Sequence, residues 1–157
     1  MTIAQSLVAF SRWPPTSNIV DIGSRRAIAQ TPEESWLPVT KRLEELIRLG
    51  RGWDGYAGSP VSFVNATFAL SMLKSICGSQ TPAPQIVPGS SGDLQVEWHT
   101  YRGDVELHVR TPNDVQAWRV NLSGVEEELT LANDFSEIVV WLKELTEPSI
   151  AAKAATA

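Results

Sequence analysis

Apolar residues recur at helical spacing in three stretches of the chain, each with polar residues on the opposite side. The first stretch opens with the capping signal Thr31-Pro32-Glu33-Glu34, but Pro38 interrupts it, so we expect its helix to begin near Leu37. The second runs from Ser62 to about Cys77. The three apolar stripes are Val39, Leu43, Leu46 and Ile47; Val64, Phe68, Met72, Leu73 and Ile76; and Ile138, Trp141, Leu142 and Leu145.

From Leu94 onward the apolar residues alternate with polar ones, which is typical of strands with one polar face. Turn signals at Arg102-Gly103, Pro112-Asn113-Asp114 and Ser123-Gly124 divide this region into four strands of an antiparallel meander. A two-residue turn at Arg102-Gly103 would place Trp98 opposite Leu107. The expected apolar positions are Leu94, Val96 and Trp98; Val105, Leu107 and Val109; Trp118, Val120 and Leu122; and Leu129 and Leu131.

The order of these elements predicts an α+β fold with two N-terminal helices, a four-stranded antiparallel meander and one C-terminal helix. We expect a partly ordered arm over residues 1–30, one domain over 31–148 with a loop at 78–93, and a flexible tail over 149–157. Four tryptophans fall on the apolar faces and are expected in the core: Trp36, Trp98, Trp118 and Trp141.

Charge is divided unevenly along the chain. Residues 1–52 carry seven Lys/Arg and five Asp/Glu, whereas residues 53–157 carry six Lys/Arg and thirteen Asp/Glu, for a net charge of −5. An acidic body disfavours direct binding to nucleic acid or to an anionic membrane and suits a basic protein partner. The single Cys77 excludes an internal disulfide, and no apolar run is long enough to span a membrane. With no basic region ahead of an apolar stretch in residues 1–13, the expected compartment is the cytoplasm.

Two aromatic-rich segments are candidates for partner binding. Arg12 and Trp13 lie in the N-terminal arm, where packing within the domain does not explain a tryptophan. Trp53, Asp54 and Tyr56 lie in a glycine-rich connector between the first two helices. We expect Trp53 to fill the core and Asp54 to fix the loop by accepting hydrogen bonds from nearby amides. A ligand or partner site at this connector is the alternative.

The segments GWDGYAGSP, PQIVPGSSGDLQVEWH and DVELHV resemble a family of small bacterial proteins. Members of that family carry a W-D-G-Y-G-A-x-P block, a P-x-V-x-P segment and a G-G-x-Q-L-E-W strand followed by L-E-I-E-I. Here Ala57-Gly58 inverts the usual order and Ser91-Gly92-Asp93 replaces the double glycine. The resemblance covers about residues 46–110 and implies the order helix, loop, helix, hairpin. The family has no assigned activity, so it supplies no catalytic residues.

The predicted hairpin carries residue types that bind metals. Glu97 and His99 share the polar face of one strand, and Glu106 and His108 share that of the next. With the Arg102-Gly103 turn, Glu97 would face His108 and His99 would face Glu106, which is a ligand set for zinc or iron. The alternative is two Glu–His contacts on a solvated sheet. We expect the latter, with no metal and no cofactor.

The chain contains no nucleophile–base, Walker-type or zinc-protease motif. We therefore expect a non-enzymatic acidic interaction module, of which an antitoxin- or inhibitor-type protein that neutralises a basic partner is one form. A small metal-binding protein or metalloenzyme built on the hairpin is one alternative. A structural homodimer formed through a sheet edge or the N-terminal arm is another.

Overall fold

The computed structural model describes residues 19–22, 25–28 and 32–146. The chain divides into two compact units, residues 1–35 and residues 36–157. In the first unit, β1 (Ile19–Ile22) pairs antiparallel with β2 (Arg25–Ile28), with Ile19 opposite Ile28. The predicted binding residues Arg12 and Trp13, and the predicted tail over 149–157, lie outside the described residues.

Three α-helices form where the apolar stripes predict them: α1 (Pro32–Ile47), α2 (Phe63–Ile76) and α3 (Ser136–Thr146). The expected start of α1 near Leu37 is wrong, because the helix begins at Pro32 and Pro38 lies inside it. Pro38 loses the hydrogen bond to the residue four positions before it and crowds that carbonyl, yet the start signal, with Pro32 at the first helical position, prevails. None of the described helices is long and apolar enough to cross a membrane.

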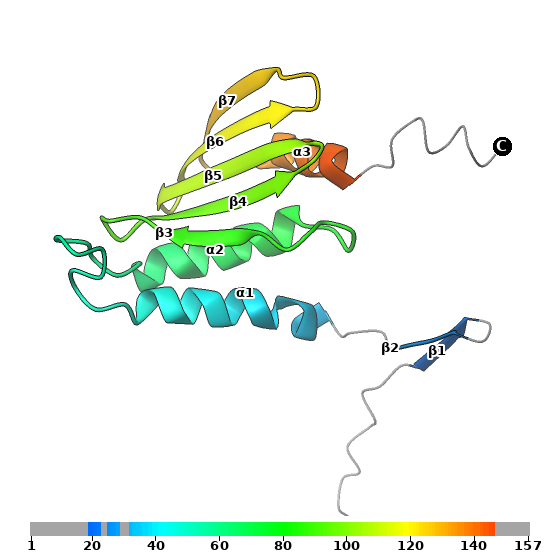
Figure 1. The fold of residues 1–157 in the computed structure, drawn as a ribbon, viewed down its shortest axis with the longest axis horizontal. Helices are drawn as coiled ribbons and strands as arrows, with labels where there is room; N and C mark the ends of the chain where they lie inside the picture. Colours follow the sequence, from blue (N-terminus) through cyan, green and yellow to red (C-terminus); the bar gives the residue numbers. More distant parts are fainter. Residues whose placement is uncertain (1–18, 23–24, 29–31, 147–157) are drawn as a thin grey trace, which may run out of the picture. The chain divides into compact units, whose positions relative to one another are not determined.

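The second unit contains an antiparallel sheet of five strands, not the predicted four (Figure 1). Its additional strand lies at one edge, within the segment predicted as a loop, and was missed because it has only four residues and ends in Pro88. The sheet follows chain order: β3 (Gln85–Pro88), β4 (Leu94–Thr100), β5 (Gly103–Thr111), β6 (Asp114–Asn121) and β7 (Glu126–Leu131).

The register of the β4–β5 hairpin differs by two residues from the prediction. Thr100 lies opposite Gly103, so Tyr101 and Arg102 form the turn, and Trp98 lies opposite Val105 instead of Leu107. The Thr100 hydroxyl donates to the Gly103 carbonyl at 3.0 Å and accepts from the Arg102 amide at 3.1 Å, which closes the turn. Gly103 is needed for a different reason: with φ at 140°, a side chain there would collide with the Val120 carbonyl oxygen.

The hydrophobic core lies between one face of the sheet and the helices. Figure 1 shows α2 and α3 behind the sheet, and both contact β5. Arg42 ties α1 to the sheet edge by donating from Nε to the Ile86 carbonyl at 3.1 Å. The buried apolar residues from the strands are Ile86, Leu94, Val96, Trp98, Val105, Leu107, Val109, Val115 and Ala117, and those from the helices include Val39, Leu43, Leu46, Met72, Leu73, Ile76, Ile138, Trp141 and Leu142.

The apolar alternation of β6 was assigned to the wrong face. Ala117 lies opposite Leu107 and is fully buried, whereas Trp118 lies opposite Glu106 on the other face and is half-buried. A β-bulge between Val109 and Thr111 sets this outcome, because it shifts the register by one residue beyond the turn and places Val115 opposite the buried Val109. The expectation that Trp118 is a core residue is therefore wrong.

The α2 stripe is confirmed at Met72, Leu73 and Ile76, which are buried, but it differs at the start of the helix. Val64 is 60% exposed, and the adjacent Asn65 is buried in its place. The Asn65 side chain donates to the Gly92 carbonyl at 2.8 Å and to the Arg110 carbonyl at 3.1 Å, so both amide hydrogens are used. A polar residue occupies the core-facing position because it joins α2 both to the connection between β3 and β4 and to β5.

Candidate interaction surface

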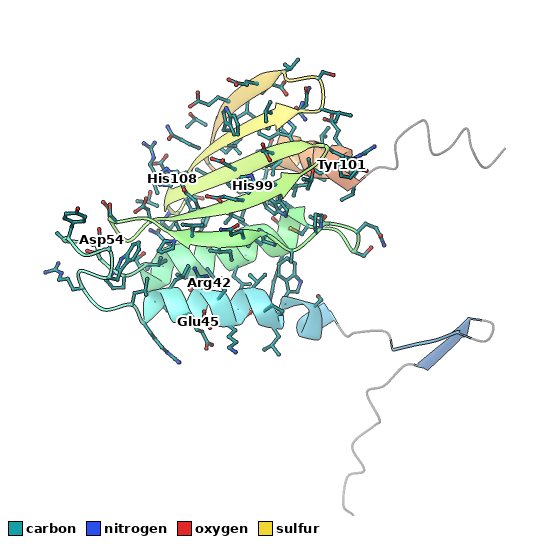
Figure 2. All side chains as sticks on the ribbon, in the orientation of Figure 1. Arg42, Glu45, Asp54, His99, Tyr101 and His108 are labelled. Carbon is teal, nitrogen blue, oxygen red and sulfur yellow. The ribbon has the colours of Figure 1, made fainter. Side chains whose placement is uncertain are left out.

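One face of the five-stranded sheet carries no helix among residues 36–146; we call it the open face. Cross-strand pairing arranges its side chains in three rows that run across the strands. Figure 2 shows His99 and His108 over β4 and β5. The rows are Gln85–Glu97–Glu106–Trp118–Glu128; His99–Asp104–Val120–Glu126; and Val87–Gln95–His108–Gln116–Thr130.

The open face is acidic. Its rows contain five carboxylates and neither lysine nor arginine. Within the described part of the chain, Glu106, Glu126 and Glu128 make no hydrogen bond or ion pair. Glu97 and Glu106 lie directly opposite each other, an arrangement of like charges that destabilises a sheet.

His99 lies between two carboxylates at one end of this face. Its Nε2 is 3.2 Å from Glu97 Oε2 and its Nδ1 is 3.1 Å from Asp104 Oδ1. Hydrogen bonds to Glu97 and then to Asp104 raise the pKa of His99 above 6.5, because both favour the protonated ring. The side chain is about half exposed, so water screens these contacts.

His108 is held by a residue outside the predicted cluster. Its Nε2 lies 2.5 Å from Asp93 Oδ2, and Asp93 also accepts a hydrogen bond from the Ser91 amide. Partial burial alone would raise the pKa of Asp93, but the hydrogen bonds from His108 and Ser91 outweigh it and hold that pKa below its usual value. In the described residues, the hydrogen bonds of both imidazoles go to carboxylates and not to a hydroxyl or thiol.

The four residues predicted as metal ligands share the open face but do not converge. Glu97 faces Glu106 instead of His108, and His108 lies opposite Gln95, four residues before His99 on the same strand. Four residues of strand correspond to about 13 Å, which is too far for both imidazoles to bind one ion. No group of three or more His, Cys, Asp or Glu side chains within the described residues is placed to hold a metal ion.

The glycine-rich connector between α1 and α2 is fixed by Asp54, as predicted. Asp54 Oδ1 accepts hydrogen bonds from the amides of Tyr56 and Gly58, each at 2.9 Å, and these lower the pKa of the carboxyl. Figure 2 shows Asp54 in the loop that projects beyond the helices. A Cβ at position 58 would lie 2.7 Å from the Asp54 carboxyl carbon, so a larger residue there would have to displace this carboxylate.

The prediction that Trp53 fills the core is wrong. Trp53 is half-buried and lies outside the hydrophobic core, and its indole nitrogen donates to the Ser59 carbonyl at 2.9 Å. Trp53 thus joins the two ends of the glycine-rich connector. Tyr56, three residues further on, is 90% exposed and lies on the surface of the loop. The connector and the open face are separate groups of candidate residues.

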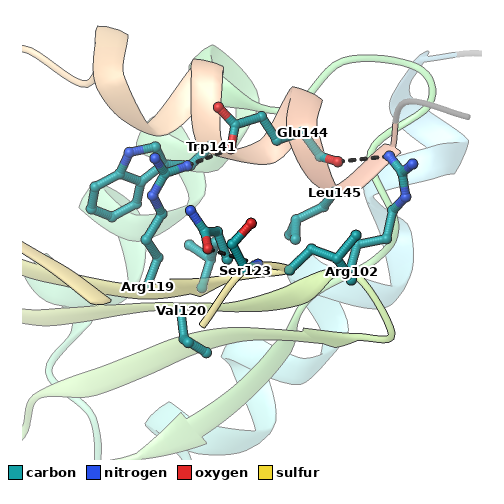
Figure 3. A pocket seen from close by; sticks show the side chains of 10 residues that line it. Arg102, Arg119, Val120, Ser123, Trp141, Glu144 and Leu145 are labelled. Carbon is teal, nitrogen blue, oxygen red and sulfur yellow. Dashed lines mark hydrogen bonds and ion pairs between the residues drawn. The ribbon is translucent and has the colours of Figure 1, made fainter. Parts of the chain in front are cut away.

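On the helix side of the sheet, a small pocket of about 210 Å³ forms between β5, β6 and α3 (Figure 3). Arg119 crosses it: the guanidinium lies 4.8 Å from the centre of the Trp141 ring, Nη1 donates to Glu144 Oε2 at 2.7 Å, and Nε donates to Glu127. Arg102 donates from Nη1 to the Glu144 carbonyl at 2.9 Å, near the C-terminal end of α3. These contacts hold α3 against the sheet.

Comparison of the chain with protein-family models, with curated proteins and with solved structures found no match in any of the three. The resemblance carried by GWDGYAGSP therefore stays a prediction, and functional inference depends on the geometry of the chain itself.

Sequence reasoning missed several members of the open face. Trp118 was placed in the core, so its neighbours Glu126 and Glu128 were not grouped with Glu97 and Glu106. The alternation of Glu126, Glu128 and Thr130 with Leu129 and Leu131 did indicate which side of β7 is polar. The two-residue turn at Pro112-Asn113 alone would pair Trp118 with Leu107, and the alternation does not indicate the β-bulge between Val109 and Thr111 that shifts this pairing by one residue.

Proposed function

We propose that this chain is a non-enzymatic protein-interaction domain that binds a basic partner through the open face. The observation that carries the proposal is the set of unpaired carboxylates at Glu106, Glu126 and Glu128, aligned in register on β5 and β7. A basic partner would supply the missing counter-charges and relieve the repulsion between Glu97 and Glu106.

Several features support a protein as the partner. The five strands, spaced about 4.8 Å apart, make a face roughly 19 Å wide, which is broad enough for a helix or loop of another protein. An acidic face repels the phosphates of nucleic acids and anionic lipids. The specific form we propose is an antitoxin- or inhibitor-type protein that neutralises a basic toxin or nuclease, because charge complementarity accelerates association with a basic partner. We propose that it acts in the cytoplasm.

The alternative of a homodimer formed through a sheet edge has less support. The β7 edge presents Glu126, Glu127 and Glu128 in succession, and repeated charge on an edge strand opposes pairing with a second copy. At the opposite edge, the Ile86 carbonyl already accepts a hydrogen bond from Arg42. Dimerisation through the N-terminal arm stays a prediction.

A binding experiment with matched charge variants tests the proposal. The full chain is immobilised, proteins captured from native-host extract are identified, and the main captured protein is purified for titration. Glu106→Gln with Glu128→Gln should weaken its binding at least tenfold and reduce the salt dependence of affinity. The control Glu44→Gln with Glu45→Gln removes the same charge from the exposed face of α1 and should have little effect. Equal binding by all three proteins would reject the open face as the interface.

A further inference from the structure

We propose that Trp118, with Glu106 and Glu128 on either side of it, is the anchor site for one arginine side chain of the basic partner. This inference rests on the proposed function and names the residue type that the open face recognises. It concerns the last three positions of one row, on β5, β6 and the edge strand β7.

The pairing register places an aromatic ring between two carboxylates. Trp118 lies directly opposite Glu106 on β5 and directly opposite Glu128 on β7. Residues paired across strands have Cβ atoms about 5 Å apart, so both carboxylates can reach a group that lies on the indole. Trp118 is half-buried, which leaves part of its ring accessible. An indole face and two carboxylates all attract a cation.

The described part of the chain does not supply that cation. Arg119 points to the helix side of the sheet, where Glu127, Glu144 and Trp141 hold it. Arg110 is paired with Asp114 at 2.9 Å, and Arg102 donates to the Glu144 carbonyl. Glu106 and Glu128 have no partner among the described residues. A charged group from another molecule is therefore the complement that the site lacks.

The same protein shows how such a set of residues binds arginine. On the opposite side of the sheet, the Arg119 guanidinium lies 4.8 Å from the centre of the Trp141 ring and is bonded to the carboxylate of Glu144 (Figure 3). It is also bonded to the carboxylate of Glu127. One tryptophan and two glutamates thus hold one arginine there. Trp118, Glu106 and Glu128 present the same three groups on the open face, with the arginine position unfilled by the described chain.

Arginine fits this site better than lysine. A planar guanidinium can lie on an indole and donate to carboxylates on two sides at once, whereas an ammonium is a compact, strongly hydrated point charge. A small quaternary ammonium ligand is not the expected occupant, because a sheet face does not enclose it on several sides as an aromatic cage does. The occupant we infer is an arginine on the surface of the basic partner.

Nuclear magnetic resonance with defined peptides tests the inference. The full chain is titrated with acetyl-Gly-Arg-Gly-Arg-Gly-amide, with the matching lysine peptide and with the matching citrulline peptide, which is uncharged. The indole N–H signal of Trp118 is assigned from its loss in Trp118→Phe. We expect the arginine peptide to shift this signal saturably, to bind at least threefold tighter than the lysine peptide, and the citrulline peptide to leave it in place. An unmoved Trp118 signal, or equal affinity for arginine and lysine, would overturn the inference.

Variants separate this inference from the proposed function. Trp118→Leu keeps an apolar residue on the open face, and thermal unfolding checks that it folds. This variant should abolish the preference for the arginine peptide and weaken binding of the captured partner at least fivefold. If Glu106→Gln with Glu128→Gln releases the partner but Trp118→Leu does not, the interface stands and the arginine site is rejected. If neither variant changes partner binding, the proposed function is rejected as well.

Discussion

Glu97 and Glu106 lie directly opposite each other on β4 and β5, so two like charges are neighbours on an open sheet face. Glu97 contacts His99, but Glu106 makes no hydrogen bond or ion pair within the described residues. Opposed like charges lower the stability of a sheet. Their presence fits a surface whose charge is used in binding.

Glu106→Gln is expected to stabilise the isolated protein. Removing one of two opposed charges should raise the free energy of unfolding at pH 7 by about 0.5 kcal/mol, because the amide keeps the size of the side chain. The gain should shrink in high salt, which screens exposed charges. Urea denaturation at two ionic strengths measures both effects. A variant less stable than the wild type would show that Glu106 makes a stabilising contact.

His99 makes the stability of the protein depend on pH. Glu97 and Asp104 raise its pKa in the folded state above 6.5, so the folded protein binds this proton more tightly than the unfolded chain does. The stabilisation is fully present below about pH 6.5 and is lost as the pH rises through the folded pKa. His99→Gln should therefore cost more stability at pH 5.5 than at pH 8.5.

Titration of the His99 ring signals by nuclear magnetic resonance gives the pKa directly. Glu97→Gln should lower it, because the amide cannot stabilise the imidazolium as a carboxylate does. A wild-type His99 that titrates at or below 6.5 would refute the predicted pH dependence.

Metal is not expected in the purified protein. Each imidazole contacts its own carboxylate partners, and the observed register separates His99 from His108 by about 13 Å along the sheet. Elemental analysis of protein purified without added metal should find no stoichiometric zinc, iron or manganese, and a chelator should leave the melting temperature unchanged. One metal ion per chain would move the metalloprotein alternative ahead of the interaction proposal.

Arg119 is expected to be the most important charged residue for holding α3. Its side chain is only 12% exposed and contacts Trp141, Glu127 and Glu144. Arg119→Ala should lower the free energy of unfolding by about 2 kcal/mol, because it removes a largely buried side chain and its cation–π contact with Trp141. Arg119→Lys should recover part of the loss. Arg48→Ala, which removes an arginine whose side chain is 79% exposed, should cost much less in the same denaturation series.

The sequence predicted the helices and strands better than it predicted the register in which the strands pair. The apolar stripes of α1 and α3 and three of the alternating strands identify the core residues, because burial imposes a period. The register of β4 and β5 could not be deduced from the turn signal, because Gly103 serves the close approach of β6 and not the turn itself. That two-residue difference decides whether Glu97 faces a histidine or a glutamate.

The misplacement of Trp118 has a related cause. Trp118, Val120 and Leu122 alternate like a core strand, yet the buried positions are filled by Val115 and Ala117, and the next position on that side by Arg119. A small residue and a snorkelling arginine carry little hydrophobic signal. The β-bulge between Val109 and Thr111 decides which side of β6 packs against the helices, and therefore which residues form the open face.

Asn65 provides a test of how α2 is joined to the sheet. Its side-chain amide donates to two carbonyls, those of Gly92 and Arg110, from a buried position. Asn65→Asp has almost the same shape but places carboxylate oxygens against carbonyl oxygens, so it should destabilise more than Asn65→Ala, which should cost about 2 kcal/mol. Chemical denaturation at pH 7 measures the stability of both variants. If Asn65→Ala unfolds at the same denaturant concentration as the wild type, the two hydrogen bonds do not hold α2 against the sheet.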